Sequence, residues 1–171
     1  MKHLKLYEEL KFNEKQYHTY ELLNLVQMHD LGSKGEAEMI DMINSGQIDL
    51  NLQDQLSYRT ALIYSMINRY EKVFDELIKS DVNLDLQDDN GNTALIISAI
   101  GSTGSSSDYY KSIMEKLIDA GADWNKTQNY GREKDFLEHI QDNEFKRHIL
   151  KKYHKQYEIY LMIKTSEKFN I

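Results

Sequence analysis

The stretch NLDLQDDNGNTALIISA, residues 83–99, decides the fold because the chain carries an earlier version of it. That version, DLNLQDQLSYRTALIYSM, spans residues 49–66. In both stretches the letters LQD precede the letters TALI. The LQD triplets lie 34 residues apart and the TALI runs 33 residues apart. A recurrence with this period predicts stacked structural repeats, in which each unit buries the apolar side of its neighbour.

Each repeat is predicted to contain a turn followed by two helices. The turn at residues 88–92 is rich in turn-forming residues, and its Gly91 can adopt a positive φ. Thr93 suits the N-cap of the first helix. The second helix is expected to end at Gly121, whereas Asp81 takes that place in the earlier repeat and is expected to be left-handed. The apolar residues at helical spacing are Leu62, Met66, Ile67, Val73, Phe74, Leu77, Ile78, Leu95, Ala99, Ile100, Ile113, Met114, Leu117 and Ile118.

This pattern resembles the ankyrin repeat, whose motif runs approximately D-x-x-G-x-T-P-L-H-x-A-A and then L-L-x-x-G-A-D-x-N. The stretch DDNGNTALIISA matches the first part, and MEKLIDAGADWN matches the second. The chain departs from the motif at the proline, which is Ala61 or Ala94 here, and at the histidine, which is Ile63 or Ile96. These departures weaken the local clamp between repeats but leave the fold prediction unchanged.

The resemblance implies an all-α ankyrin-repeat solenoid of about four helix-turn-helix units, forming a single domain over residues 1–171. The clear repeats are predicted at 49–82 and 83–124. Degenerate caps are predicted at about 16–48 and about 125–152, because the terminal repeats of such arrays are atypical.

The segments outside the predicted helix pairs comprise a helix at each end and two loops. The first dozen residues predict a separate helix that covers the N-cap unit. A C-terminal amphipathic helix is predicted to reach about residue 168, with large residues recurring every four positions at Phe145, Ile149, Tyr153, Tyr157 and Leu161. This helix either caps the last repeat, which the even spacing favours, or docks on a partner or an anionic membrane. Residues 29–36 and 101–108 predict flexible loops.

The sequence holds no motif that indicates catalysis or metal binding. It has no cysteine, and none of its six histidines belongs to an H-E-x-x-H motif. Glu144 with His148, and Asp135 with His139, lie four residues apart on predicted helices and are interpreted as solvated ion pairs. We therefore expect no enzyme and no cofactor. A metal-dependent enzyme with a site near His139 and His148 is the weakest alternative.

The net charge of −7 is concentrated in the middle of the chain. Residues 41–125 carry 6 basic and 14 acidic side chains, whereas residues 126–171 carry 10 basic and 7 acidic ones. An acidic middle disfavours direct nucleic-acid binding and favours a protein partner with a basic surface. No apolar run approaches the ~20 residues of a membrane span, and the N-terminus does not resemble a secretory leader. The expected location is the cytoplasm, of the source cell or of a host cell.

The resemblance implies a non-enzymatic protein-binding module that is monomeric on its own. An inhibitor, immunity protein or host-directed effector from a bacterium or virus is the expected role. A structural subunit joined through the C-terminal helix is the alternative. In ankyrin proteins, partners commonly bind the turn tips and the exposed face of the first helices. The matching positions here are Gln55, Leu56, Tyr58, Arg59, Ile67, Asn68, Asp89, Asn90, Asn92, Ile100, Asn129, Tyr130 and Arg132.

Three large side chains on the predicted turn tips stand out among these positions. Leu56, Tyr58 and Tyr130 have little structural use on a solvated tip, so they are the strongest candidates for contact with a partner. Tyr58 alternatively braces its turn, which is one residue longer than the next. Trp124, the only tryptophan, is expected to pack under the following hairpin, with a binding anchor as the alternative.

Overall fold

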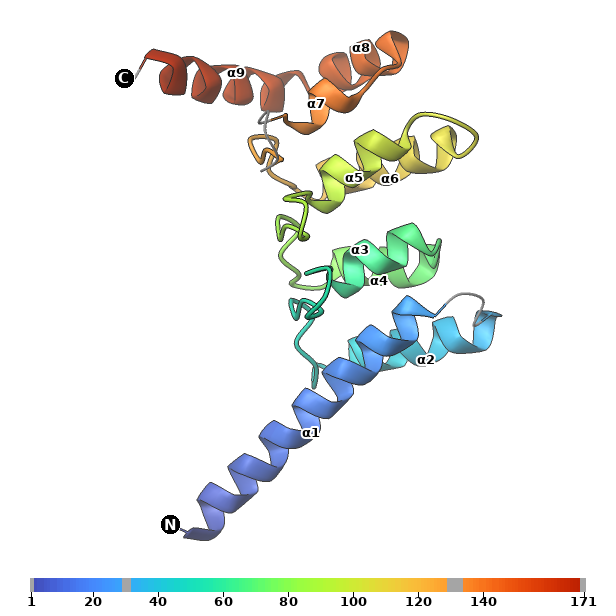
Figure 1. Ribbon diagram of the computed structural model, residues 1–171, viewed down its shortest axis with the longest axis vertical. Helices are drawn as coiled ribbons and strands as arrows, with labels where there is room; N and C mark the ends of the chain where they lie inside the picture. Colours follow the sequence, from blue (N-terminus) through green and yellow to red (C-terminus); the bar gives the residue numbers. More distant parts are fainter. Residues whose placement is uncertain (1, 29–31, 129–133, 170–171) are drawn as a thin grey trace. The chain divides into compact units, whose positions relative to one another are not determined.

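A computed structural model describes residues 2–28, 32–128 and 134–169, and all regular structure in these ranges is helical (Figure 1). The predicted all-α class is confirmed. The chain divides into two compact units, Met1–Leu86 and Gln87–Ile171, referred to as unit 1 and unit 2. Within the described ranges, no helix combines the length and the apolar character needed to cross a membrane.

Unit 1 contains four helices around one core. They are α1 (Lys2–Gln27), α2 (Gly32–Asn44), α3 (Ala61–Ile67) and α4 (Glu71–Lys79). Helix α1 packs on α2 and α3, and α4 packs on the same two helices. The buried side chains come at helical spacing from all four helices and include Leu22, Val26, Met39, Leu62, Met66, Val73, Phe74 and Leu77. Since α2 starts at Gly32, the flexible loop predicted over residues 29–36 is wrong from that residue onward.

The separate N-terminal helix predicted from the sequence is wrong, because α1 is one continuous helix of 26 residues. Thr19 lies inside α1. Its hydroxyl donates a hydrogen bond to the carbonyl oxygen of Lys15 (2.7 Å) and accepts one from the N–H of Asp49 (2.9 Å). Figure 1 shows the N-terminal half of α1 continuing past the other helices of unit 1.

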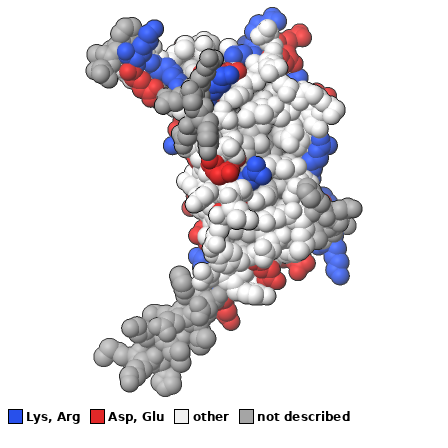
Figure 2. Space-filling model, in the orientation of Figure 1, with Lys and Arg blue, Asp and Glu red and all other residues white. Residues whose placement is uncertain are grey.

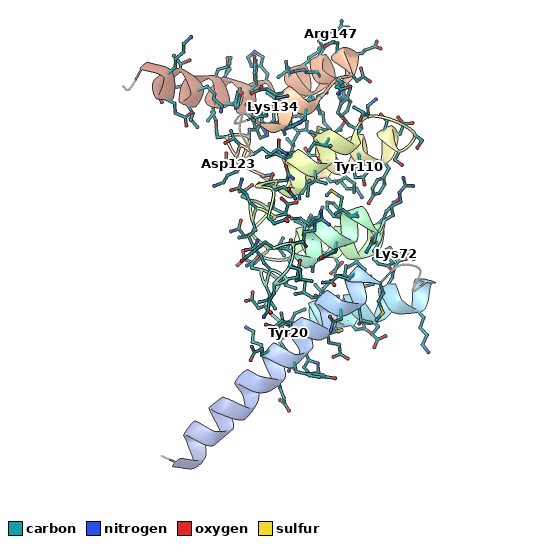
Figure 3. The ribbon with its side chains drawn as sticks, viewed as in Figure 1. Tyr20, Lys72, Tyr110, Asp123, Lys134 and Arg147 are labelled. Carbon is teal, nitrogen blue, oxygen red and sulfur yellow. The ribbon has the colours of Figure 1, made fainter. Side chains whose placement is uncertain are left out.

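Unit 2 contains five helices in the described ranges. They are α5 (Ala94–Gly101), α6 (Ser107–Asp119), α7 (Phe136–His139), α8 (Asn143–Lys152) and α9 (His154–Phe169). Helix α5 packs on α6 and α7, and α8 packs on α9. The loop between α5 and α6 is shorter than the predicted 101–108. Gly101 is the last residue of α5. A Cβ at this position would lie only 2.7 Å from Cδ2 of Tyr110, which is labelled in Figure 3, so the glycine makes room for this ring.

The C-terminal segment is two helices, so the prediction of one amphipathic helix is wrong. The break falls at Tyr153, whose φ of −109° and ψ of 38° are not helical. Ile149 and Tyr153 are buried. The Tyr153 ring meets the indole of buried Trp124 edge to face, with centroids 6.3 Å apart. The indole therefore packs inside the unit, as the sequence interpretation expected.

The helix ends follow the sequence closely, with one exception. Thr60 and Thr93 are the N-caps of α3 and α5. Each hydroxyl accepts a hydrogen bond of 3.3 Å from the N–H group three residues later in the chain. Gly121 has a φ of 93°, as predicted. The left-handed conformation predicted for Asp81 is wrong, because α4 ends at Lys79 and its C-cap Ser80 is already extended, and the φ of Asp81 is not positive.

Candidate protein-binding surface

The turns that precede the first helices share one arrangement. Each is closed by a backbone hydrogen bond just before the N-cap of the helix, which is Thr60, Thr93 or Asp135. The closing bonds run from Asp54 to Arg59 (3.0 Å), from Asp88 to Asn92 (2.9 Å) and from Gln128 to Lys134 (3.0 Å). The closing residues are thus five, four and six positions apart, so the turns differ in length while the cap position stays constant.

In unit 1 the carboxylate of Asp54 organises the turn. Its Oδ1 accepts hydrogen bonds from the N–H groups of Leu56 and Ser57 (both 2.8 Å). Its Oδ2 accepts from the N–H of Arg59 (2.9 Å), the hydroxyl of Ser57 (2.6 Å) and the hydroxyl of Tyr64 (3.0 Å). Partial burial alone would raise the pKa of Asp54. The hydrogen bonds from Ser57, Leu56 and Arg59 outweigh burial and hold this pKa well below its usual range.

This fixed backbone presents two apolar side chains to solvent. Leu56 is 91% exposed and Tyr58 is 55% exposed. Tyr58 has a φ of 53°, which is unusual for a residue with a side chain. Its carbonyl oxygen accepts a hydrogen bond of 2.6 Å from Nε2 of Gln53. The adjacent Gln55 is exposed and Arg59 is half-buried. Leu56 and Tyr58 therefore project from a turn that is already held in one conformation.

The equivalent turn in unit 2 is organised by the buried Asp88. Its Oδ1 accepts hydrogen bonds from the N–H groups of Asn90 (3.0 Å) and Asn92 (2.8 Å). Gly91 supplies the positive φ, at 74°, as predicted. Asp89 and Asn90 are exposed, and Nδ2 of Asn90 donates a hydrogen bond to Oδ1 of Asp89 (2.8 Å). The exposed tip of this turn is polar.

Asn92 belongs to the interior of unit 2 rather than to its surface. It is 8% exposed, and its Oδ1 accepts a hydrogen bond from Nε2 of Gln128 (2.7 Å). Gln87 makes a second link of this kind, since its Nε2 donates to the carbonyl oxygen of Thr127 (2.8 Å). These bonds hold successive turns of unit 2 together, so the structure gives Asn92 a structural role.

The remaining predicted contact residues are divided between helix surfaces and undescribed positions. Ile67 and Asn68 are half-buried at the end of α3, and Nδ2 of Asn68 donates a hydrogen bond to the carbonyl oxygen of Val26 (2.8 Å). Ile100 is 42% exposed on α5. Three predicted contact residues lie outside the described residues, namely Asn129, Tyr130 and Arg132.

Helix α1 exposes aromatic side chains that the sequence reading did not select. Tyr17 is 65% exposed and Tyr20, labelled in Figure 3, is 37% exposed. Beside them, a shallow pocket of about 340 Å³ is lined by Lys15, Gln16, Thr19, Asp49 and Leu52. The sequence could have predicted this pair, because residues three positions apart lie on the same side of a helix.

Two predicted solvated ion pairs are wrong. Asp135 is buried and accepts a hydrogen bond from the hydroxyl of Tyr160 (2.6 Å). Its predicted partner His139 has a lowered pKa, mainly because burial disfavours the charged ring. Nε2 of His148 lies 3.0 Å from Oε1 of Glu115 on α6 instead of pairing within its own helix. Among the described residues, no group of three or more histidine, aspartate or glutamate side chains is placed to hold a metal ion.

The acidic charge belongs mainly to unit 1. Residues 1–86 carry 9 basic and 15 acidic side chains, a net charge of −6, whereas residues 87–171 carry 12 basic and 13 acidic ones, a net charge of −1. On the drawn face, charged side chains lie singly or in small groups among uncharged ones (Figure 2). The unit that exposes Leu56 and Tyr58 is therefore also the acidic one.

A family model of ankyrin repeats in three copies matches residues 28–131. The chain belongs to the ankyrin-repeat family, and its repeats form a protein-interaction module. No curated protein sequence matches it significantly. A similar solved chain occurs in the structure of the predatory endopeptidase Bd0816 from Bdellovibrio bacteriovorus in complex with immunity protein Bd3460. The TM-score is 0.57 at 24% identity, covering 77% of this chain and 63% of that one. The likeness shows the fold, and the match spans less than two thirds of that chain's length.

Proposed function

We propose that this protein is a non-enzymatic inhibitor that neutralises a partner enzyme by binding it through unit 1, in the manner expected of an immunity protein. Membership of the ankyrin-repeat family supports a binding role. The similar solved structure holds an endopeptidase together with an immunity protein, and this supports an enzyme as the partner. The site of action would be the cytoplasm of the source cell or of a host cell.

The observation that carries the proposal is the exposure of Leu56 on a fixed turn. A leucine side chain that is 91% exposed keeps apolar surface in contact with water, which is unfavourable in free energy, and it contributes nothing to the core. Because Asp54 already holds the turn, docking Leu56 and Tyr58 into an apolar pocket would lose little conformational entropy. A few anchor residues, among which tyrosine is common, contribute most of the energy at protein interfaces, and Tyr58 beside Leu56 is of this type. The partner is therefore expected to offer an apolar pocket at its contact site.

The negative charge of unit 1 indicates that the partner's surface around that pocket is basic. A net charge of −6 attracts a basic protein over several ångströms and accelerates its association at low salt. Gln55 and Arg59 would form the polar rim, where contacts contribute less energy than the anchor.

The proposal is tested by identifying the partner and then measuring affinity with purified proteins. The tagged chain captures its partner from the source cell, and Leu56→Ala is expected to weaken the purified complex about tenfold or more. The matched control is Met162→Ala, because Met162 is a comparably exposed apolar residue on α9. Equal affinities for Leu56→Ala and wild type would refute the docking role of the turn.

The inhibitory role needs a separate measurement. The captured enzyme is assayed with and without a stoichiometric amount of the chain, and loss of activity is expected. An enzyme that stays fully active in the complex would refute inhibition and favour a structural subunit of a larger assembly.

The electrostatic part is tested by association kinetics. Asp81→Lys, at an exposed position of unit 1, is expected to lower the association rate several-fold at low salt and to change it little at about 0.5 M salt. Asp88 is unsuitable for this test, because it is buried and holds its turn. A rate that does not depend on salt would remove the requirement for a basic partner.

A further inference from the structure

Helix α1 presents a second surface on the side opposite the core of unit 1. Leu22, Leu23 and Val26 are buried on its inner side. Tyr17 and Tyr20 lie about half a revolution away from these residues and face solvent. Exposed aromatic side chains that gather on one side of a helix typically mark an interaction surface, because they add nothing to the packing of their own unit.

The spacing along this outer side is that of a coiled-coil seam. Steps of alternately three and four residues keep a row of positions on one side of a helix. The positions in this row, which we call the α1 seam, are Leu6, Leu10, Asn13, Tyr17, Tyr20 and Asn24. Helix α1 is unbroken through all of them, so the seam runs for about 27 Å at the rise of an α-helix. Its N-terminal part lies on the half of α1 that extends past the other helices of unit 1 (Figure 1).

Of the seven register positions that border the seam, three hold a glutamate and one holds a lysine, so the charged residues among them are mainly acidic. Glu9 and Glu14 occupy bordering positions on opposite sides, and Glu21 follows Glu14 one heptad later. Glu14 is exposed, and Glu21 is half-buried with its Oε2 3.1 Å from Nδ1 of His18. The one basic residue at a bordering position is Lys2. Charges at these positions select the partner of a coiled coil, and two copies of this seam would oppose glutamate with glutamate.

We propose that the α1 seam binds an amphipathic helix of a partner protein whose own apolar stripe is bordered by lysine or arginine. The acidic border attracts such a helix and repels a second copy of this chain. The inference rests on the proposed function only in requiring a protein partner with a basic surface. The α1 seam shares no residue with the turn that carries Leu56.

The test uses two synthetic helical peptides of about three heptads with the same leucine stripe. One has lysine at its bordering positions and the other has glutamate. Each carries a fluorophore, and binding to the full chain is followed by anisotropy. The lysine-bordered peptide is expected to bind at least about tenfold more tightly than the glutamate-bordered one, and the preference is expected to shrink as salt increases.

Two variants locate the binding. Tyr17→Ala combined with Tyr20→Ala is expected to weaken the lysine-bordered peptide about tenfold or more, whereas Tyr58→Ala, at another exposed tyrosine of unit 1, leaves it unchanged. Glu14→Lys is expected to weaken the lysine-bordered peptide and strengthen the glutamate-bordered one. Glu38→Lys makes the same charge change at an exposed position of α2 and is expected to shift neither.

Equal binding of both peptides, or binding that survives the double tyrosine change, would overturn the proposal. Concentration-dependent dimerisation of the chain alone, abolished by the double tyrosine change, would also overturn it, because a second copy would then occupy the seam. Helical circular dichroism and the urea midpoint show that each variant is folded. Leu56→Ala keeps full peptide binding, so failure of this inference is distinguishable from failure of the proposed function.

Discussion

The turn at residues 54–59 and the turn at residues 88–92 start from the same tripeptide, yet they present different surfaces. The first is closed by residues five positions apart and the second by residues four apart. Both need a left-handed residue near the closing bond. This residue is Tyr58 in the longer turn, with a φ of 53°, and Gly91 in the shorter one, with a φ of 74°.

The extra residue therefore changes what the turn shows to solvent while its anchor stays in place. Asp54 and Asp88 each accept hydrogen bonds from backbone N–H groups of their own turn. The longer turn exposes the side chains of Leu56 and Tyr58, whereas the shorter one has a polar tip and places Asn92 inside the unit. In this chain, a turn that is one residue longer and carries Leu56 and Tyr58 is thus a candidate contact site, whereas the shorter turn is structural.

The largest expected effect comes from removing the anchor of the longer turn. Asp54→Ala leaves three backbone N–H groups and two hydroxyls without their acceptor. We expect a loss of about 2–3 kcal/mol in the free energy of unfolding, measured with urea. Asp88→Ala is expected to cost less, because two backbone N–H groups donate to Asp88 together with a long bond of 3.5 Å from Nδ2 of Asn92, whereas the five bonds to Asp54 are all 3.0 Å or shorter. The exposed Gln55→Ala is the control and is expected to change stability by less than about 0.5 kcal/mol. A larger cost at Asp88 than at Asp54 would reverse the comparison.

The same anchor predicts how stability depends on pH. The pKa of Asp54 lies below the unfolded value of about 3.9, so its carboxylate contributes stability above about pH 4, and this contribution is lost as the pH falls further. Asp54→Asn is therefore expected to flatten the fall in the urea midpoint below about pH 4. Asp142, whose pKa is lowered to about 2 by its hydrogen bond with Lys111, leaves part of the fall in place. Leu56→Ala alters the same turn without a titratable group, and a flattened curve in that variant would argue against Asp54 as the cause.

A smaller effect is expected at the left-handed position of the shorter turn. Gly91→Ala places a Cβ at a φ of 74°, where an L-residue is strained by roughly 1–2 kcal/mol. The expected loss in the free energy of unfolding is of that size. The control is Asn90→Ala, one residue earlier on the exposed tip, with a smaller expected loss. A Gly91→Ala protein as stable as wild type would show that this turn tolerates a side chain at its left-handed position.

Much of the fold follows from local chemistry that the sequence displays directly. The recurring threonines predict the N-caps at Thr60 and Thr93, because their hydroxyls accept bonds from the next turn of the helix. Glycine predicts the left-handed end at Gly121. The candidate tip residues Leu56 and Tyr58 follow from the same register, since position within a repeat sets which side chains reach solvent.

The features that escaped prediction depend on contacts between residues distant in sequence. The break at Tyr153 places its ring against Trp124, which a regular four-residue spacing does not reveal. Asn92 looks like a tip residue until Gln128, 36 residues later, donates a hydrogen bond to it. Asp135 resembles half of an i to i+4 ion pair, whereas it is buried, its Oδ1 caps α7 by accepting from the N–H groups of Leu137 and Glu138, and its Oδ2 accepts from the hydroxyl of Tyr160. The spacing of residues in the sequence predicts on which face of a helix a side chain lies, but it does not predict which residues pack against that face.

The smallest expected effect, and the one with opposite sign, comes from Tyr58→Gly. Glycine relieves the strain of a φ of 53°, at the cost of greater freedom in the unfolded chain. The expected net gain in the free energy of unfolding is about 0.5 kcal/mol, measured with urea. Affinity for the captured partner is expected to fall at the same time, because the exposed ring is gone.

Tyr58→Ala keeps the strain and loses the ring, so it is expected to weaken binding without the gain in stability. If Tyr58→Gly gains stability and binds as tightly as wild type, Tyr58 only bridges the longer turn. A loss of stability would instead mean that its ring braces the turn.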